Sequence, residues 1–333
     1  MVETLTVENF KSIKHIKLNC RRINVFIGGP NTGKSNILEV IGLLSSLCYD
    51  AEKIRSFIRF EELSNLFYDE IVDKGFKLIL DDLSVKGEWR ESGLTLHVTT
   101  PKDYSYAYLR KSSPKKKDKG KLYWQWQWPL KIDIKKFKFY RFIPKTEFPD
   151  KTTEFILPPH GDNLVNILAH SKELREIANS IIGKFGFKLA IRPREGKLEI
   201  QRELEEGVII GFPYSLISDT LQRIIFYSAV VCSNRDSVIA IEEPEAHAFP
   251  YYTKYLAELI AFDKNNNQYF ITTHNPYFLL SLIEKTPKNE IAVHITYYKD
   301  YQTKVKLLND AELREILDQG IDVFFNIERF LED

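Results

Sequence analysis

Cysteine and methionine are scarce in this 333-residue chain, which has three cysteines and one methionine. Cys20, Cys48 and Cys232 stand far apart and match none of the spacings that bind zinc or carry out redox exchange. This pattern excludes a disulfide framework and a cysteine-based metal site. We expect the three thiols to be small buried groups in a reducing compartment.

A charge excess of one sign is lacking as well. The 47 lysines and arginines nearly balance the 46 aspartates and glutamates, so the formal net charge is +1. Global charge therefore does not direct the chain to nucleic acid or to an acidic partner, and any such surface must be local. The apolar runs are too short to cross a bilayer, and the N-terminus alternates apolar and polar residues instead of forming a signal peptide. We expect a cytoplasmic protein without membrane contact.

Hydrophobic periodicity predicts an α/β fold in which both ends of the chain build the core. We treat residues 1–333 as one discontinuous domain. Residues 1–60 and 232–333 form its core lobe, and residues 61–231 form a β-rich and helical lobe. The expected core strands are 23–27, 237–241 and 269–272, and the expected helices are 36–47, 164–182, 221–231, 251–261 and 278–283.

Residues 101–131 stand out within the second lobe as a hairpin insertion. Alternating tyrosines lead into a lysine-rich tip, and alternating tryptophans lead back. Lysine clusters beside aromatic residues can bind phosphate backbones. Charge runs are more often solvated, so we favour a packed hairpin with a solvated tip.

A glycine-rich segment fits the consensus G-x-x-x-x-G-K-[ST] at every fixed position, between an expected strand and an expected helix. Glycines let the backbone wrap a phosphate with its N–H groups pointing inward, and the helix N-terminus adds a favourable field. Lys34 can reach the β and γ phosphates, and the Ser35 hydroxyl can ligate Mg²⁺. We assign nucleotide binding to Gly28, Gly29, Pro30, Asn31, Thr32, Gly33, Lys34, Ser35 and Asn36.

Carboxylates follow the apolar run 237–241. Ligands gather at the carboxyl ends of parallel strands, so we assign Glu242 to Mg²⁺ together with Ser35. Glu243 then polarises the attacking water. A third strand ends at His274, which can hydrogen-bond a γ-phosphate and sense its loss. The catalytic set predicted from the sequence is Glu243, His274 and Lys34.

Together these motifs resemble the Walker A, Walker B and switch-histidine motifs of ABC-type ATPases. Val7-Glu-Asn-Phe-Lys-Ser-Ile13 and Glu242-Glu-Pro-Glu-Ala-His247 are similar to the SMC/RecF/OLD-like branch, also called the AAA_21 and AAA_15 ATPases. The resemblance implies an ABC-type P-loop NTPase core with an antiparallel β subdomain and a helical signature lobe. It implies ATP and Mg²⁺ as cofactors and a homodimer with ATP at the interface. Too few residues follow His274 for a Toprim nuclease domain, so the chain is expected to stand alone.

The same resemblance places a signature loop at Leu216–Arg223, where it would cap the ATP of the partner subunit. Ser218 keeps the hydroxyl of such a loop, and Arg223 resembles the arginine that ends it. Asp219 and Thr220 replace the usual glycines, so the backbone approaches phosphate less freely. Asn65 is the candidate for the Q-loop position.

Three function classes remain open. The first is an ATPase in nucleic-acid metabolism or defence that acts on DNA or controls a nuclease encoded as a separate chain. The absence of heptads argues against an SMC or Rad50 head with coiled-coil arms. The second is a non-catalytic, nucleotide-dependent interaction module, which the irregular signature favours. The third is a transporter nucleotide-binding subunit, which would be expected to carry a regular signature and a Q-loop glutamine.

Overall fold

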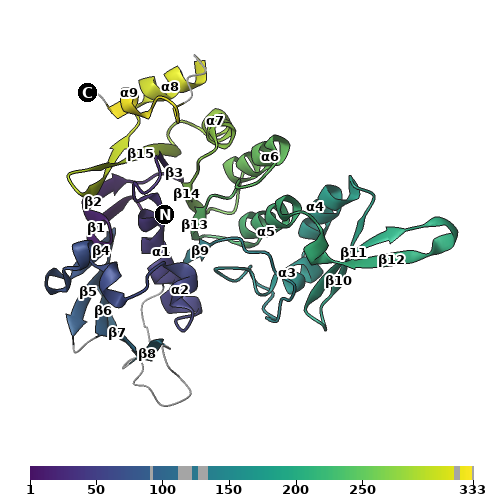
Figure 1. Ribbon diagram of the computed structural model, residues 1–333, viewed down its shortest axis with the longest axis horizontal. Helices are drawn as coiled ribbons and strands as arrows, with labels where there is room; N and C mark the ends of the chain where they lie inside the picture. Colours follow the sequence, from purple (N-terminus) through teal and green to yellow (C-terminus); the bar gives the residue numbers. More distant parts are fainter. Residues whose placement is uncertain (91–92, 112–121, 127–133, 319–322, 332–333) are drawn as a thin grey trace.

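A computed structural model describes residues 1–90, 93–111, 122–126, 134–318 and 323–331 and contains three sheets (Figure 1). The strands are β1 (Thr4–Phe10), β2 (Ile13–Asn19), β3 (Ile23–Gly28), β4 (Phe76–Leu80), β5 (Leu83–Arg90), β6 (Gly93–Thr99), β7 (Tyr104–Lys111), β8 (Leu122–Trp126), β9 (Phe137–Tyr140), β10 (Lys188–Arg192), β11 (Lys197–Glu203), β12 (Ile209–Pro213), β13 (Val238–Glu242), β14 (Gln268–Thr272), β15 (Ile291–Lys299) and β16 (Gln302–Leu307). The helices are α1 (Lys34–Tyr49), α2 (Ile54–Phe57), α3 (Leu164–His170), α4 (Lys172–Gly183), α5 (Asp219–Ser233), α6 (Pro250–Ala261), α7 (Pro276–Lys285), α8 (Asp310–Asp318) and α9 (Ile327–Leu331). Short 3₁₀ turns lie at Leu63–Leu66, Tyr68–Glu70, Val72–Lys74, Glu205–Gly207 and Tyr214–Leu216.

The central sheet has the order β16-β15-β3-β14-β13-β9, and only β16 runs antiparallel to its neighbour. Strands β3, β13 and β14 are almost entirely buried, as expected for parallel strands covered on both faces. Because they are parallel, their carboxyl ends meet at one edge of the sheet. The order places β14 between β3 and β13, so the three predicted motifs leave neighbouring strands.

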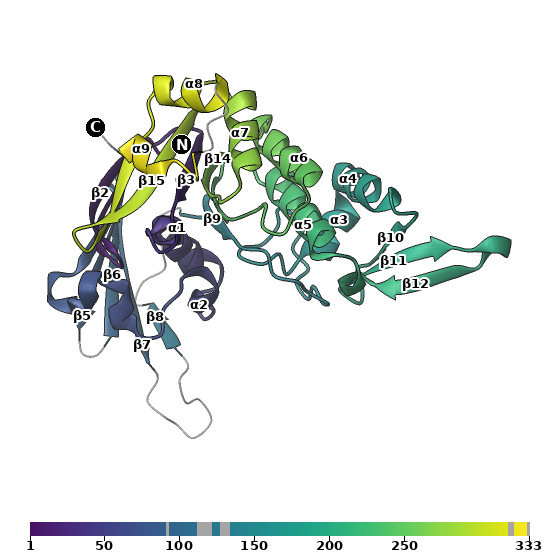
Figure 2. The same ribbon diagram turned by 45° about the horizontal axis from the view of Figure 1, so that its top comes forward.

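Helix α1 lies between the central sheet and a seven-stranded antiparallel sheet of order β2-β1-β4-β5-β6-β7-β8 (Figure 2). One hydrophobic cluster joins them: Val7 from β1, Ile41 from α1 and Phe270 from β14 are all fully buried. The expected hairpin is present as the antiparallel pair β7 and β8. It extends this sheet at one edge, and its lysine-rich tip lies outside the described residues.

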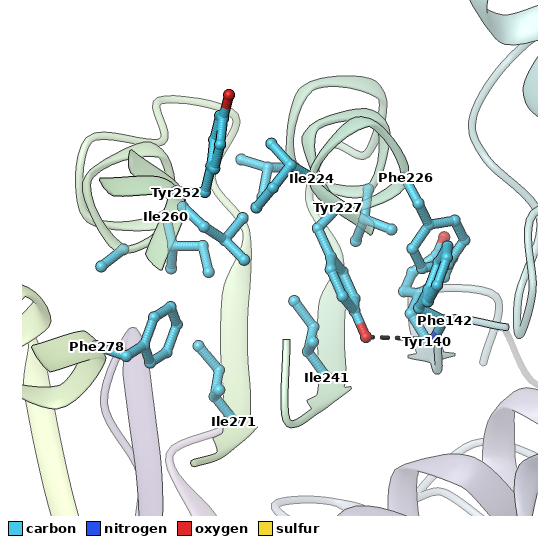
Figure 3. Close-up of a cluster of buried hydrophobic side chains, with 14 of the residues drawn as sticks. Tyr140, Phe142, Ile224, Phe226, Tyr227, Ile241, Tyr252, Ile260, Ile271 and Phe278 are labelled. Atoms are coloured by element: carbon cyan, nitrogen blue, oxygen red, sulfur yellow. Dashed lines mark hydrogen bonds between the residues drawn. The ribbon is translucent and has the colours of Figure 1, made fainter. Parts of the chain in front are cut away.

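Helices α5, α6 and α7 cover the other face of the central sheet. Figure 3 shows Ile241 and Ile271 of the sheet beneath Ile224, Tyr252 and Phe278 of these helices. Helix α5, which begins within the signature segment, therefore packs directly on the strand that carries the predicted acidic pair.

Two expectations about the middle of the chain are wrong. Residues 164–182 are not one helix, because α3 ends at His170 and Ser171 turns into extended backbone. The Ser171 hydroxyl accepts a hydrogen bond from Leu174 N–H at 3.2 Å and so starts α4 as its N-cap. Strand β9 lies within the 61–231 segment but pairs with β13 at the edge of the central sheet. The strand contains the buried Lys138, whose ammonium donates to Asn234 Oδ1 at 2.7 Å. Because this charged residue interrupts the apolar run, hydrophobic periodicity does not predict the strand.

A three-stranded sheet of order β10-β11-β12 projects from the helical side of the molecule, away from the two larger sheets (Figures 1 and 2). β12 leads directly into the signature segment. Within the parts of the chain that the structure describes, no helix is both long enough and apolar enough to span a bilayer.

Candidate functional site

The phosphate-binding loop leaves β3 at Gly28 and enters α1 at Lys34. Gly28 has φ 148° and Gly33 has φ 91°, conformations that L side chains rarely adopt. A Cβ at Gly28 would stand 2.2 Å from the Thr296 carbonyl oxygen, and a Cβ at Gly33 would stand 2.1 Å from Thr303 Oγ1. Both glycines are therefore required by backbone conformation and by space.

Hydroxyl groups from the neighbouring strands hold this loop in place. Thr32 donates to the Gly29 carbonyl at 2.9 Å and shares a 2.7 Å hydrogen bond with Thr296 of β15. Asn36 Nδ2 donates to Ser12 Oγ at 2.7 Å, and Ser12 in turn pairs with Thr303. The loop is therefore formed in advance of any ligand, which lowers the ordering cost of binding.

Lys34 faces the inside of the loop. Its ammonium donates to the carbonyls of Gly28 at 2.9 Å and Gly29 at 2.7 Å. Burial lowers the pKa of Lys34 to about 8, and the negative charge of Glu243 opposes this shift. A phosphate group would offer this buried cation a stronger partner than neutral carbonyls do.

A cavity of about 400 Å³ opens above the loop. It collects several cationic groups, Lys11, Lys34 and Arg59, around a single carboxylate, Glu243. This charge pattern suits a polyphosphate. The lining residues are Lys11, Ser12, Pro30, Asn31, Thr32, Gly33, Lys34, Ser35, Asn36, Arg59, Glu243 and His274.

Glu242 ends β13 beside Ser35, whose hydroxyl helps to lower the pKa of the Glu242 carboxyl. Both carboxylate oxygens also accept from arginines, Oε1 from Arg59 and Oε2 from Arg141, each at 2.6 Å. Burial alone would raise the pKa of Glu242, but Arg141, Ser35 and Arg59 outweigh it, so the pKa lies below its ordinary value. Glu242 is therefore held as a carboxylate next to a hydroxyl, the donor pair that Mg²⁺ prefers.

Glu243 has a left-handed backbone, with φ 43°. Its N–H donates to the Thr272 carbonyl at 3.1 Å, which ties the end of β13 to β14. Its Oε1 lies 3.4 Å from Nε2 of His274, and both side chains are partly exposed to the cavity. The hydrogen bond from His274 lowers the pKa of Glu243 against the effect of burial. The two groups that were assigned to the water and to the γ-phosphate therefore lie side by side.

Two family models match the chain. One, AAA_15, described as "AAA ATPase domain", matches residues 1–156. The other, AAA_21, described as "AAA domain, putative AbiEii toxin, Type IV TA system", matches residues 127–281. Together the two matches span residues 1–281, so most of the chain is similar to AAA-type ATPase domains.

Solved structures show the same fold. A Smc head bound to the C-terminal winged-helix domain of ScpA is 15% identical, with a TM-score of 0.55, and the match covers 95% of this chain and 99% of that chain. A Smc head with an extended coiled coil, bound to the C-terminal domain of ScpA and derived from Pyrococcus furiosus, is 13% identical, with a TM-score of 0.51 and coverage of 96% and 99%. No curated protein matches the chain. The α/β fold with a P-loop core, expected from the motifs, is confirmed.

Ser218 and Arg223 do not line the cavity above the phosphate-binding loop. Ser218 is exposed at the N-terminus of α5, where it borders a second, largely apolar hollow of about 470 Å³ with Phe249 and Tyr251. Arg223 points inward instead. Its guanidinium lies 4.7 Å from the centre of the Phe142 ring and donates a long, 3.5 Å hydrogen bond to the Glu243 carbonyl of the same chain.

The Q-loop candidate Asn65 lies outside the cavity. Its side chain accepts the backbone N–H groups of Glu61 and Glu62, and it donates to Glu70 at 3.1 Å. Asn65 thus closes a capping box on a 3₁₀ turn. This arrangement is a local structural role.

The sequence motifs missed four charged residues beside the site: Lys11, Glu39, Arg59 and Arg141. Glu39 of α1 is fully buried and binds Lys11 Nζ and Arg59 Nε, the latter at 3.1 Å. Burial lowers the pKa of Lys11, against the attraction of Glu39. Lys11 belongs to the Val7–Ile13 motif that the sequence shows, but the sequence does not show that Glu39 is its partner.

Proposed function

We propose that the protein binds ATP with Mg²⁺ and hydrolyses the terminal phosphoanhydride bond. The observation that carries the proposal is the contact between Glu243 and His274 over a preformed phosphate loop that holds a buried lysine. The loop amides and Lys34 bind the β and γ phosphates. Glu243 accepts a proton from the attacking water, and His274 donates a hydrogen bond to the γ-phosphate.

Ser35 and Glu242 are the residues that would hold Mg²⁺. The ion, when bound, neutralises charge on the phosphates and offsets the charge that develops during cleavage. Arg59 and Arg141 occupy both oxygens of Glu242, so metal binding requires at least one arginine to move or to share its oxygen. Arg59 lines the cavity and is half exposed, which gives it room to turn toward a phosphate.

We further propose that two copies close head to tail around two nucleotides. Ser218 is exposed at the start of α5, so it is free to face the P-loop of a second copy. The helix N-terminus that follows Ser218 favours an anion, while Asp219 in its first turn weakens that preference. Arg223 donates a hydrogen bond to the Glu243 carbonyl of its own chain, so we assign it to the support of Glu243 within one copy. To act across the dimer, Arg223 would first have to leave this contact.

We also propose that the ATP cycle serves nucleic-acid metabolism or defence through a separate effector chain. The solved Smc heads were each bound to a domain of ScpA, which supports regulation by a second protein. Stimulation of turnover by DNA would support an action on nucleic acid. Identical turnover with single-stranded, double-stranded and no DNA would remove that part of the proposal.

Two substitutions test the hydrolysis proposal. Lys34→Ala should abolish ATP binding or weaken it severely, because the loop loses its buried cation. Glu243→Gln should keep binding and lose turnover, because the amide cannot accept the proton. Binding is measured by titration calorimetry and turnover by phosphate release. Normal turnover in both variants would contradict the assignment.

A further inference from the structure

Glu245 is the least exposed carboxylate of the Glu-Glu-Pro-Glu segment and takes no part in the chemistry proposed so far. Only 4% of the residue is exposed. Burial raises the pKa of its carboxyl, and hydrogen bonds from Thr273 and His274 oppose the shift. A buried carboxylate is costly unless its oxygens are satisfied, so its partners identify what the group holds.

Both hydrogen bonds to Glu245 come from the loop that carries the switch histidine. Oε1 accepts the Thr273 hydroxyl at 2.6 Å and the His274 backbone N–H at 3.1 Å. Glu245 thus fixes the backbone of His274, from which the imidazole side chain extends. The second oxygen, Oε2, is buried and has no hydrogen-bond partner among the described residues.

The same two loops are joined at three further points. Glu243 N–H donates to both the carbonyl and the hydroxyl of Thr272, at 3.1 and 3.2 Å. The side chains of Glu243 and His274 meet at 3.4 Å. Glu243 lies two residues before Glu245, in a left-handed conformation that turns the chain toward β14. The contact between Glu243 and His274 is therefore one of several contacts between these two loops, and the hydrogen bonds to Glu245 are the buried ones.

We propose that Glu245 is a positioning residue for hydrolysis, which fixes the His274 loop so that the imidazole stays beside Glu243 and the γ-phosphate. The inference rests on the proposed ATPase function and adds a residue to its machinery. Glu245 does not touch the nucleotide cavity, because the lining includes Glu243 and His274 and not Glu245. Its loss should therefore change the rate of the chemical step and leave ATP affinity unchanged.

Glu245→Ala and Glu245→Gln test the idea as a pair. The alanine variant loses both hydrogen bonds and should lower kcat at least tenfold, with the KM for ATP within twofold of wild type. Glutamine keeps an acceptor oxygen at the position of Oε1, so it should restore most of kcat. Titration calorimetry with a non-hydrolysable ATP analogue checks that binding is intact.

A double variant separates positioning from a general loss of structure. If Glu245 acts through His274, Glu245→Ala in a His274→Ala background should cost no further activity, since coupled residues are not additive. Thr273→Val keeps the shape of a fully buried side chain and removes one of the two hydrogen bonds. It should lower kcat several-fold, and it carries the test if Glu245→Ala does not fold.

Each outcome decides the matter. A kcat loss that glutamine rescues and that is absent in the His274→Ala background supports the proposal. Wild-type kcat in both Glu245→Ala and Thr273→Val, or a loss that adds fully to that of His274→Ala, overturns it. If the wild-type chain shows no Mg-ATP turnover, both this inference and the proposed function are overturned. If the wild-type chain turns over Mg-ATP and only the variants behave otherwise than expected, the inference about Glu245 fails alone.

Discussion

Glu39 provides the sharpest stability prediction, because its side chain is fully buried at the centre of a cluster of charges. Its oxygens bind Lys11 and Arg59, and Arg141 Nη2 lies 4.0 Å away. Glu39→Gln keeps the shape and removes the charge. Lys11, whose side chain is only 9% exposed, then loses its carboxylate partner.

The magnitude follows from the burial of both members of the pair. Removing one member of a buried ion pair costs about 3 to 5 kcal/mol. Arg59 is half exposed and recovers part of its hydration, so we expect about 3 kcal/mol for Glu39→Gln. In a chain of 333 residues that loss lowers Tm by roughly 4 °C.

Thermal and urea unfolding followed by circular dichroism measure this loss, with Glu176→Gln as the matched control. Glu176 forms a helical pair with Lys172 at 3.6 Å, with both side chains mostly exposed, so its loss should stay below about 0.5 kcal/mol. Combining Glu39→Gln with Lys11→Met should recover part of the stability, because the uncompensated buried cation is removed. A Glu39→Gln effect no larger than that of Glu176→Gln would refute the reasoning.

Three further predictions concern the nucleotide site. Gly33→Ala should weaken ATP binding at least tenfold by calorimetry, because φ 91° is strained for alanine and its Cβ would meet Thr303 Oγ1 at 2.1 Å; Gly183→Ala, with open space around it, should bind normally. Lys34 should make ATP binding pH-dependent. Its pKa is about 8, so the ammonium is present below that pH and lost above it. The affinity for ATP should therefore be level near pH 7 and fall toward about tenfold per pH unit above pH 8. A Lys34→Arg variant that shows the same fall would exclude this lysine as the titrating group. Ser218→Arg should leave ATP affinity unchanged and stop ATP-dependent association in light scattering, since Ser218 is exposed and outside the cavity; unaltered association would remove Ser218 from the interface.

Local signals explain which parts of the fold could be predicted. Continuous apolar runs predict the three core strands β3, β13 and β14, and helical spacing of apolar residues predicts α1, α6 and α7. Strand β9 could not be found this way, because its place in the sheet depends on pairing with β13 about one hundred residues later. The break at Ser171 depends on a capping hydrogen bond that competes with helix continuation.

The candidate site likewise has a part that local sequence motifs predict and a part that depends on residues far apart in the chain. Consecutive motif residues place Lys34, Ser35 and Glu243 because a short loop fixes their geometry. Glu242 and Arg141 are 101 positions apart, and Glu242 and Arg59 are 183 apart, so no spacing rule links them. The charges that hold the metal-side carboxylate are therefore products of the tertiary fold, and only the structure reveals them.

The most direct measurement is the mass of Glu243→Gln by light scattering, with and without Mg-ATP. The variant should bind ATP and fail to hydrolyse it, so a closed pair should accumulate. We predict a shift from monomer to dimer when Mg-ATP is added, and no shift with Mg²⁺ alone. A mass that stays at one chain while calorimetry shows bound ATP would contradict closure around the nucleotide.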